Sequence, residues 1–413
     1  MSYVLVENGT LIDGNGGDPV ANGAVLIKDN IIEQVGTKDS IQIPAGANVE
    51  TIDAKGGTIL PGLIDAHVHI TFELGSLEER ASTPFSLKFY QTIEYMRKTL
   101  DAGITTIRDA GGADLGLKQA VNNGLVVGPR MQLSINALTI TGGHGDSWML
   151  SGMDLTRQGY PGMPNGLCDG KEEVRKKTRE MLRAGADLIK VHSTGGVMSP
   201  TDHPEYTQFA LEELEVMVEE ARFHRNKKVM AHAQGTEGIQ NAIKAGIHSI
   251  EHGIYLDDET IEMMKEHGTY LVPTLLAPVG VLELAEERSL PKYAVKKAEE
   301  VVNDHMESFR RAHKAGVKIA MGTDAGVFTH GINLRELGLM CEGGMTPMES
   351  IVATTKVAAE CMGWEDQVGT LEAGKFADVV ILNGDPLDDI HVIENQDNIV
   401  TVLKDGKIVK DLR

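Results

Sequence analysis

Six residues that could build a metal site lie at or just after the carboxyl ends of apolar, strand-like runs. In chain order they are His67, His69, Lys190, His232, His252 and Asp324. Imidazole and carboxylate groups are ligands for divalent cations such as zinc. Alternate side chains of an extended strand point to the same face, so the pair at positions 67 and 69 can bind one ion, whereas a helix would separate these rings by about 200°. The spacing predicts one metal site at the ends of several strands.

Helix-like segments, such as residues 211–224 and 258–267, separate these strand-like runs. Strands that alternate with helices favour parallel βαβ units. Metal ligands gathered at the carboxyl ends of parallel strands are typical of the active face of a barrel. The sequence therefore predicts an α/β fold whose main unit is a (β/α)8 TIM barrel.

Structural explanations remain for each of these residues taken alone. A single histidine is more often a core or surface residue than a ligand, and the H-x-H pair is a weak signal by itself. Lys190 is the unusual member, because an ammonium group has no lone pair and is repelled by a cation. It could simply be a barrel lysine whose head reaches the strand end. Four imidazoles and a carboxylate at successive strand ends nevertheless favour a metal site.

The sequence resembles the amidohydrolase superfamily, specifically the binuclear-metal branch that contains Xaa-Pro dipeptidases (amidohydrolase-type prolidases) and related carboxypeptidase-like enzymes. The resemblance covers nearly the whole chain. It rests on LPGLIDAHVH at 60–69, GGHGD at 142–146, IKVHSTGGV at 189–197, AHA at 231–233, SIEHG at 249–253, GTDAG at 322–326 and GTLEAGKFADVV at 369–380.

This resemblance implies two divalent metal ions, with zinc first and manganese, cobalt or iron as alternatives. It assigns His67, His69 and Asp324 to the first ion, and His232 and His252 to the second. It also implies that Lys190 is carboxylated, because a carbamate would turn the amine into a ligand that bridges both ions.

The implied reaction is hydrolysis of an amide bond. Water between two divalent cations loses a proton near neutral pH, and the resulting hydroxide can attack a polarised carbonyl carbon. Asp324 is the predicted catalytic residue, which takes a proton from the attacking group and passes it to the leaving nitrogen. His144, in the glycine-rich motif, is expected to hydrogen-bond the substrate carbonyl, although it could instead organise its loop. Tyr206 and His330 are the other predicted substrate-binding residues.

The expected substrates are dipeptides, with the Xaa-Pro type first, or N-acyl amino acids. The alternatives are a cyclic amidase activity on imidazolone-type rings, a bulky N-acyl phenylalanine mycotoxin, and a non-catalytic scaffold that kept the fold. Several relatives anchor the substrate carboxylate with a tyrosine, and Phe209 takes that place here. Tyr206, three residues earlier, could supply the hydroxyl group instead, another group could contact the carboxylate, or the substrate could lack that carboxylate.

The two chain ends carry short alternating strands separated by Asn-Gly, Asp-Gly and Gly-Gly turns. Residues 1–57 and 370–413 are therefore expected to form one small β-sandwich domain, and residues 58–369 the metal-dependent hydrolase barrel. The sandwich carries no evident catalytic group, so its expected role is structural.

The composition excludes some classes of partner. A formal net charge of −21 and a pI near 5.1 disfavour binding to nucleic acid or to an anionic membrane surface. Three cysteines without C-x-x-C spacing fit a reducing compartment, and the sequence contains no signal-peptide pattern or long apolar span. We therefore expect a cytoplasmic enzyme with a small-molecule substrate, and the resemblance implies a homo-oligomer.

Overall fold

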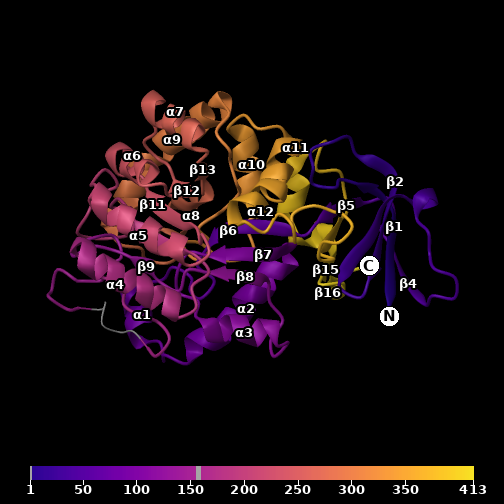
Figure 1. Ribbon diagram of the computed structural model, residues 1–413, viewed down its shortest axis with the longest axis horizontal. Coiled ribbons are helices and arrows are strands. Elements are labelled where there is room, and N and C mark those ends of the chain that lie inside the picture. Colours follow the sequence, from indigo (N-terminus) through magenta and orange to yellow (C-terminus); the bar gives the residue numbers. More distant parts are fainter. Residues whose placement is uncertain (1, 155–159) are drawn as a thin grey trace.

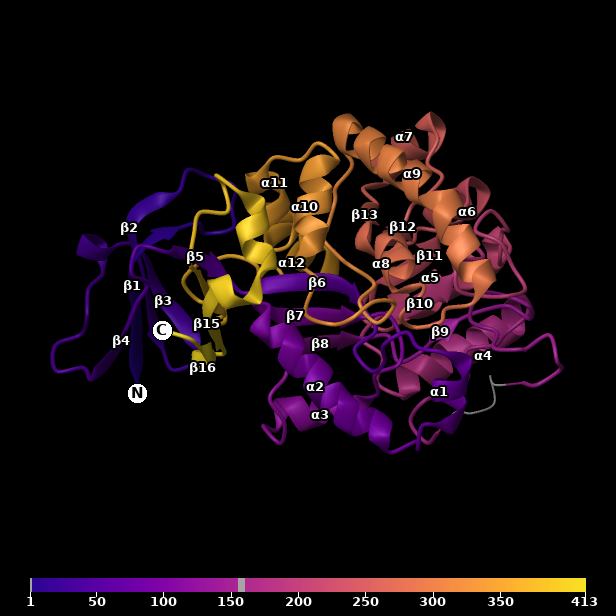
Figure 2. The same ribbon diagram turned by 180° about the vertical axis from the view of Figure 1, so that it is seen from behind.

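The computed structural model of the chain describes residues 2–154 and 160–413. Its strands fall into a barrel and a separate sheet, which lie side by side in Figure 1 and again in the opposite view of Figure 2. Both chain termini lie at the sheet (Figure 1). Among the described residues, no helix is both long and apolar enough to cross a membrane.

Parallel strands form the barrel. In chain order they are β6 (Leu63–Val68), β7 (Ile104–Asp109), β8 (Arg130–Leu133), β9 (Ala137–Leu138), β10 (Ile189–His192), β11 (Val229–Ala233), β12 (Ser249–His252) and β13 (Tyr270–Val272). β8 pairs with β7 and β9 pairs with β10, and only residues 134–136 separate β8 from β9, so these two strands share one barrel position. Residues 319–325 close the ring, because parallel bridges join Leu271 to Ile319 and Val68 to Ala325. The predicted TIM barrel is confirmed.

Helices cover the outside of the barrel (Figures 1 and 2). They are α1 (Leu77–Ser82), α2 (Leu87–Asp101), α3 (Leu115–Asn122), α4 (Gly170–Arg183), α5 (Leu211–Phe223), α6 (Thr236–Lys244), α7 (Asp258–His267), α8 (Leu276–Leu284), α9 (Lys292–Ala315), α10 (Arg335–Glu342), α11 (Pro347–Ala353) and α12 (Lys356–Met362). α7 shows why such segments are helical: the Asp257 side chain accepts a hydrogen bond from the Thr260 amide, and Gly268 ends the helix at φ 66°. Its Ile261 and Met264 are buried, three residues apart on one face.

Both chain ends contribute to one eight-stranded sheet. Its strands are β1 (Tyr3–Leu11), β2 (Val20–Lys28), β3 (Ile31–Thr37), β4 (Val49–Asp53), β5 (Thr58–Pro61), β14 (Val379–Leu382), β15 (Ile399–Lys404) and β16 (Lys407–Asp411), with 3-10 turns η1 (Lys38–Ser40), η2 (Ile390–Glu394) and η3 (Gln396–Asn398). The order is β16-β15-β14-β5-β1-β2-β3, with β4 on β1. β5 joins the two ends of the chain, because it pairs with β1 and with β14.

This sheet contacts the amino ends of the barrel strands. Arg130, the first residue of β8, donates hydrogen bonds to the carboxylates of Asp378 and Asp405. Lys410 of β16 donates to the carbonyl of Asp101, shortly before β7 begins. The candidate histidine and aspartate ligands lie at the opposite, carboxyl ends of the strands, so the sheet contacts the barrel away from them. Lys190 departs from the expected position, because it is the second residue of the four-residue strand β10.

Candidate metal centre

Three predicted ligands converge in the structure. Nitrogen and oxygen atoms of His67, His69 and Asp324 lie within 4.8 Å of one another, and no other group of three His, Cys, Asp or Glu donors in the described part of the chain is this close. Nε2 of His67 lies 3.4 Å from Asp324 Oδ1, and Nε2 of His69 lies 3.3 Å from the same oxygen. The 67/69 spacing at the end of β6 therefore brings both rings to one carboxylate oxygen, as expected.

The Nδ1 atoms of His67 and His69 each carry a proton, because each contacts a hydrogen-bond acceptor. His69 Nδ1 is 2.8 Å from the carbonyl oxygen of Gly111, which can only accept a hydrogen bond. His67 Nδ1 is 2.7 Å from the Glu251 carboxylate, which also accepts. Burial lowers the pKa of His67 well below its ordinary value, so its ring is neutral and Nε2 keeps its lone pair.

These protonation states make the three atoms suitable for a cation. Asp324 Oδ1 is buried and, among the described residues, makes no hydrogen bond. The lone pair of His67 Nε2 therefore faces this carboxylate oxygen. At His69 burial opposes the charged form of the ring, but the Asp324 carboxylate and the Gly111 carbonyl outweigh burial and raise the pKa of this histidine. A divalent ion would take the place of a proton between the His69 nitrogen and the carboxylate oxygen, so these residues fit a metal ion.

Two candidate ligands sit on backbone that L-residues rarely adopt. His252 has φ 73° and Asp324 has φ 64°, both in the left-handed region. Each such residue costs about 1–3 kcal/mol, and strain of this kind gathers at functional sites. His305 of α9 stabilises the turn after His252, because its Nε2 donates to the carbonyls of His252 (2.9 Å) and Pro273 (2.7 Å).

The remaining predicted ligands lie on the neighbouring strands. Lys190 is 1% exposed, and burial lowers its pKa to about 8, which favours the neutral amine, the form whose lone pair can attack carbon dioxide. The rings of His232 and His252 have centroids 4.6 Å apart, and those of His252 and His67 are 5.1 Å apart. His232 Nε2 donates to the Gly195 carbonyl at 2.9 Å, which leaves Nδ1 with its lone pair.

His192 is a neighbour of His232 that the sequence analysis did not identify. Its Nδ1 is buried and has no hydrogen-bond partner among the described residues.

A buried ion pair under His67 was also missed by sequence reasoning. Glu251 is 0% exposed, and Arg108 contacts both its carboxylate oxygens at 3.0 and 3.2 Å. Arg108 Nε also donates to the Ala66 carbonyl at 2.6 Å. The available signal was a glutamate and an arginine inside otherwise apolar strands, since buried charges require partners.

Replacement of Glu251 by glutamine is expected to weaken metal affinity about 10- to 100-fold, as is typical when the partner of a metal-binding histidine is lost. The amide can no longer supply a charged acceptor for His67 Nδ1. Competition with a chromophoric chelator measures the affinity. Glu220→Gln is a matched control, because Glu220 is also buried and paired with Arg175 and Arg179, but on α5. Equal affinities in the Glu251→Gln variant and the wild type would contradict this role.

The three predicted substrate-binding residues have different surroundings. The His144 ring stacks on His232, with centroids 4.2 Å apart and planes at 17°, so it lies beside the predicted ligands. Tyr206 is 60% exposed, and its carbonyl accepts from the Gly195 amide. His330 is 2% exposed, with Nε2 3.0 Å from the Phe72 carbonyl and its ring stacked on Tyr95. His144 stacks on a predicted ligand and the His330 ring lies close to His69, whereas Tyr206 is exposed. Substrate roles for all three residues stay predictions.

Phe209 is buried and has a left-handed backbone conformation. It is 4% exposed and has φ 61°. A tyrosine at this place would carry its hydroxyl on strained, buried backbone. The phenylalanine side chain offers no hydroxyl group here.

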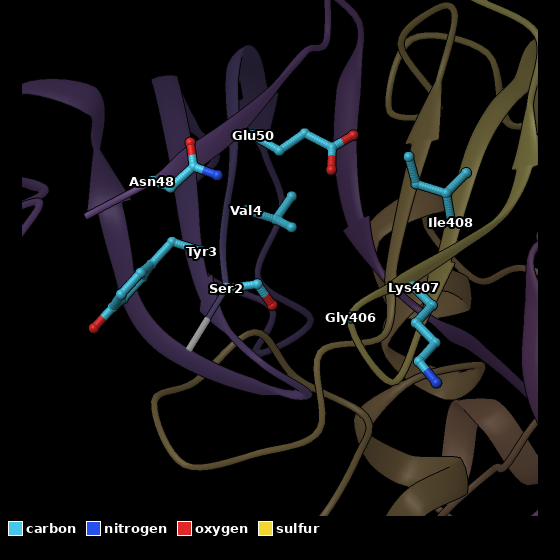
Figure 3. A pocket seen from close by; sticks show the side chains of 8 residues that line it. All are labelled: Ser2, Tyr3, Val4, Asn48, Glu50, Gly406, Lys407 and Ile408. Atoms are coloured by element: carbon cyan, nitrogen blue, oxygen red, sulfur yellow. The ribbon is translucent and has the colours of Figure 1, made fainter.

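A pocket away from the centre lies in the chain-end sheet. Figure 3 shows its lining, which comes from both ends of the chain: Ser2, Tyr3, Val4, Asn48, Glu50, Gly406, Lys407 and Ile408. None of these is a candidate metal ligand.

Comparisons with known proteins agree with this geometry. A family model described as the amidohydrolase family matches residues 58–409. Ochratoxinase of Aspergillus niger is 36% identical over 420 residues, which cover 98% of this chain and 86% of that protein. A solved Xaa-Pro dipeptidase with methionine bound in its active site has a TM-score of 0.89 and 35% identity, covering 99% of this chain and 100% of that one. The crystal structure of A. niger ochratoxinase has a TM-score of 0.88 and 36% identity, covering 99% and 96%.

Proposed function

Because the chain belongs to the amidohydrolase family and is a hydrolase of amide bonds, we propose that it releases the C-terminal amino acid of dipeptides or N-acyl amino acids. Xaa-Pro dipeptides are the first class to test. The observation that carries this proposal is the convergence of two imidazole nitrogens and the Asp324 carboxylate on one point at the carboxyl ends of the barrel strands.

We propose two divalent metal ions, zinc first and manganese, cobalt or iron as alternatives. His67, His69 and Asp324 would hold one, and His232 and His252 the other, with a carboxylated Lys190 between them. When bound, such ions polarise an amide carbonyl and lower the pKa of water to near neutrality. Burial lowers the pKa values of His67, His232 and His252 and also that of Lys190, which supports this set of ligands.

The chain's own residues would then move the proton and orient the substrate. Asp324 Oδ1 is free of hydrogen bonds within the described residues, so it can accept a proton from the attacking water. The same carboxyl group would give that proton to the leaving nitrogen. His144, beside His232, would contact the substrate carbonyl from the glycine-rich loop.

A bulky N-acyl phenylalanine is the second substrate class, favoured by the 36% identity to ochratoxinase over nearly the whole chain. Phe209 in place of a tyrosine also weakens the case for a single strict dipeptide class. Cyclic amides of the imidazolone type remain a third possibility. A non-catalytic scaffold is disfavoured, because such a protein would gain nothing from candidate ligands on strained backbone or from a buried carboxylate that faces two imidazole nitrogens.

We also propose how the chain is divided into domains. The chain-end sheet would fold on itself as a small β-sandwich domain of residues 1–57 and 370–413, beside a barrel of residues 58–369, with β5 as a strand shared across that boundary. We further propose a cytoplasmic homo-oligomer. The free thiols of Cys168, Cys341 and Cys361 are consistent with a reducing compartment.

Release of amino acids from a substrate library tests the function. Zinc- and manganese-loaded protein is incubated with Xaa-Pro dipeptides, other dipeptides and N-acyl-L-phenylalanines, and each freed amino acid is quantified. Selective release of proline supports the dipeptidase assignment, and selective release of phenylalanine supports the second class. No release from any amide in the library would contradict the proposed function.

A further inference from the structure

One exposed aromatic side chain lies beside the metal centre. Phe72 follows His69 by three residues, in the segment between β6 and α1, and the centroids of the two rings are 5.3 Å apart with their planes at 39°. Phe72 is 40% exposed and the His69 side chain is 20% exposed, so solvent reaches both members of this pair. Loops at the carboxyl ends of barrel strands build the active sites of such barrels. Neither metal binding nor proton transfer uses this apolar ring.

The contact with His69 distinguishes Phe72 from other exposed apolar residues, which are common singly on protein surfaces. Phe85 is 56% exposed, but its ring packs against Phe89 and Tyr160. Among the residues that the structure describes, no other exposed aromatic ring contacts the ring of a candidate ligand. An apolar group that covered Phe72 would remove both surfaces from water, which is favourable.

The backbone of Phe72 is fixed by a neighbouring loop. His330 Nε2 donates a hydrogen bond to the Phe72 carbonyl at 3.0 Å, and the Leu74 amide donates to the Gly326 carbonyl at 2.6 Å. Gly326 has φ 116°, and a Cβ there would come within 2.9 Å of the His69 carbonyl oxygen and 3.2 Å of the Phe72 carbonyl oxygen. These contacts fix the point at which the Phe72 side chain leaves the backbone, and none of them requires the phenyl ring.

The rings of the centre form a chain of contacts with Phe72 at one end and His144 at the other. Successive centroids lie 4.2 Å apart for His144 and His232, 4.6 Å for His232 and His252, 5.1 Å for His252 and His67, and 5.7 Å for His67 and His69. Asp324 Oδ1 lies 3.3 Å from His69 Nε2, at the Phe72 end. Since His144 is assigned to the substrate carbonyl and Asp324 to the leaving nitrogen, the leaving amine lies at the end that holds Phe72.

We propose that Phe72 is a specificity-determining residue, whose ring packs against the apolar side chain of the leaving amino acid. This inference rests on the proposed function, because the roles of His144 and Asp324 set the direction of the substrate. It unites the two substrate classes, since proline and phenylalanine both carry an apolar ring. Glycine has no side chain to place against Phe72, so amides of glycine should be poorer substrates.

Kinetics on a matched series test this contact. The series keeps the acyl part of the amide that the wild type cleaves best, and varies the leaving residue among phenylalanine, leucine, proline and glycine. Phe72→Ala should lower kcat/KM about tenfold for the apolar leaving residues and less than about twofold for glycine. Phe72→Leu, which keeps an apolar side chain, should retain most of the preference. Phe85→Ala, which removes an exposed ring that touches no candidate ligand, is the matched control.

Two kinetic outcomes would overturn the proposal. One is a wild type that cleaves the glycine amide as fast as the apolar ones. The other is a loss in Phe72→Ala that is equal for all leaving residues, which would mean that the ring only supports His69.

Product binding gives a readout that needs no turnover. L-phenylalanine and glycine are titrated separately into zinc-loaded protein in a calorimeter. The wild type should bind L-phenylalanine about tenfold more tightly than glycine, and Phe72→Ala should lose that difference. No preference in the wild type, or the same preference in Phe72→Ala, would overturn the proposal. Silence of the wild type on all amides contradicts the proposed function instead, and the binding measurement still decides the role of Phe72.

Discussion

Asp324→Asn is expected to lower kcat by about 10²- to 10⁴-fold, the range typical of a lost general base. Asparagine keeps the size of the side chain but cannot accept a proton, and it is a weaker metal ligand than a carboxylate. The effect should be on turnover and metal retention, with the fold preserved, because Asp324 lies at the end of the strand ring and its amide still donates to the His67 carbonyl at 2.7 Å.

The measurement combines steady-state kinetics, metal content and thermal unfolding. Asp258→Asn is a suitable control, since this exposed aspartate pairs with Arg311 far from the centre. Turnover at the wild-type rate in Asp324→Asn would remove this residue from the mechanism.

Lys190→Ala is expected to reduce kcat/KM at least about 100-fold, beyond the loss typical of a residue that only supports a ligand. Alanine cannot carry the proposed carbamate, so the metal content should also fall. Lys190→Arg should be equally impaired, because a guanidinium keeps the positive charge but is not carboxylated.

Added acetate or propionate should partly restore the alanine variant by filling the space of the missing carbamate, and should leave the arginine variant inactive. Lys265→Ala, at an exposed position of α7, controls for loss of a lysine. An alanine variant with full activity and two ions per chain would exclude the bridging carbamate.

The barrel and its ligand positions could be predicted because both follow from short-range patterns. Apolar runs of strand length, each ending in a polar residue, identify the carboxyl ends of parallel strands, and the family motifs fix their order. His67, His69 and Asp324 therefore met in the structure as expected. β5 lies within the residue range predicted for the barrel, but its pairing with β1 and β14 places it in the chain-end sheet.

Supporting contacts could not be predicted, because they join residues that are distant in the sequence. Arg108 meets Glu251 across 143 positions, and Lys297 meets Asp202 across 95. No local spacing encodes such pairs, and only the closure of the barrel and the packing of α9 bring them together. The left-handed backbone of His252 is likewise a property of the folded turn, held by His305 through two carbonyls.

Metal dependence is the central claim, and a titration tests it most directly. The protein is stripped with a chelator, its residual metal is quantified, and zinc is added stepwise while turnover of the amide that the wild type cleaves best is measured. We expect negligible turnover of the stripped protein, with a rise that levels off at two ions per chain. Full turnover by metal-free protein would contradict the account.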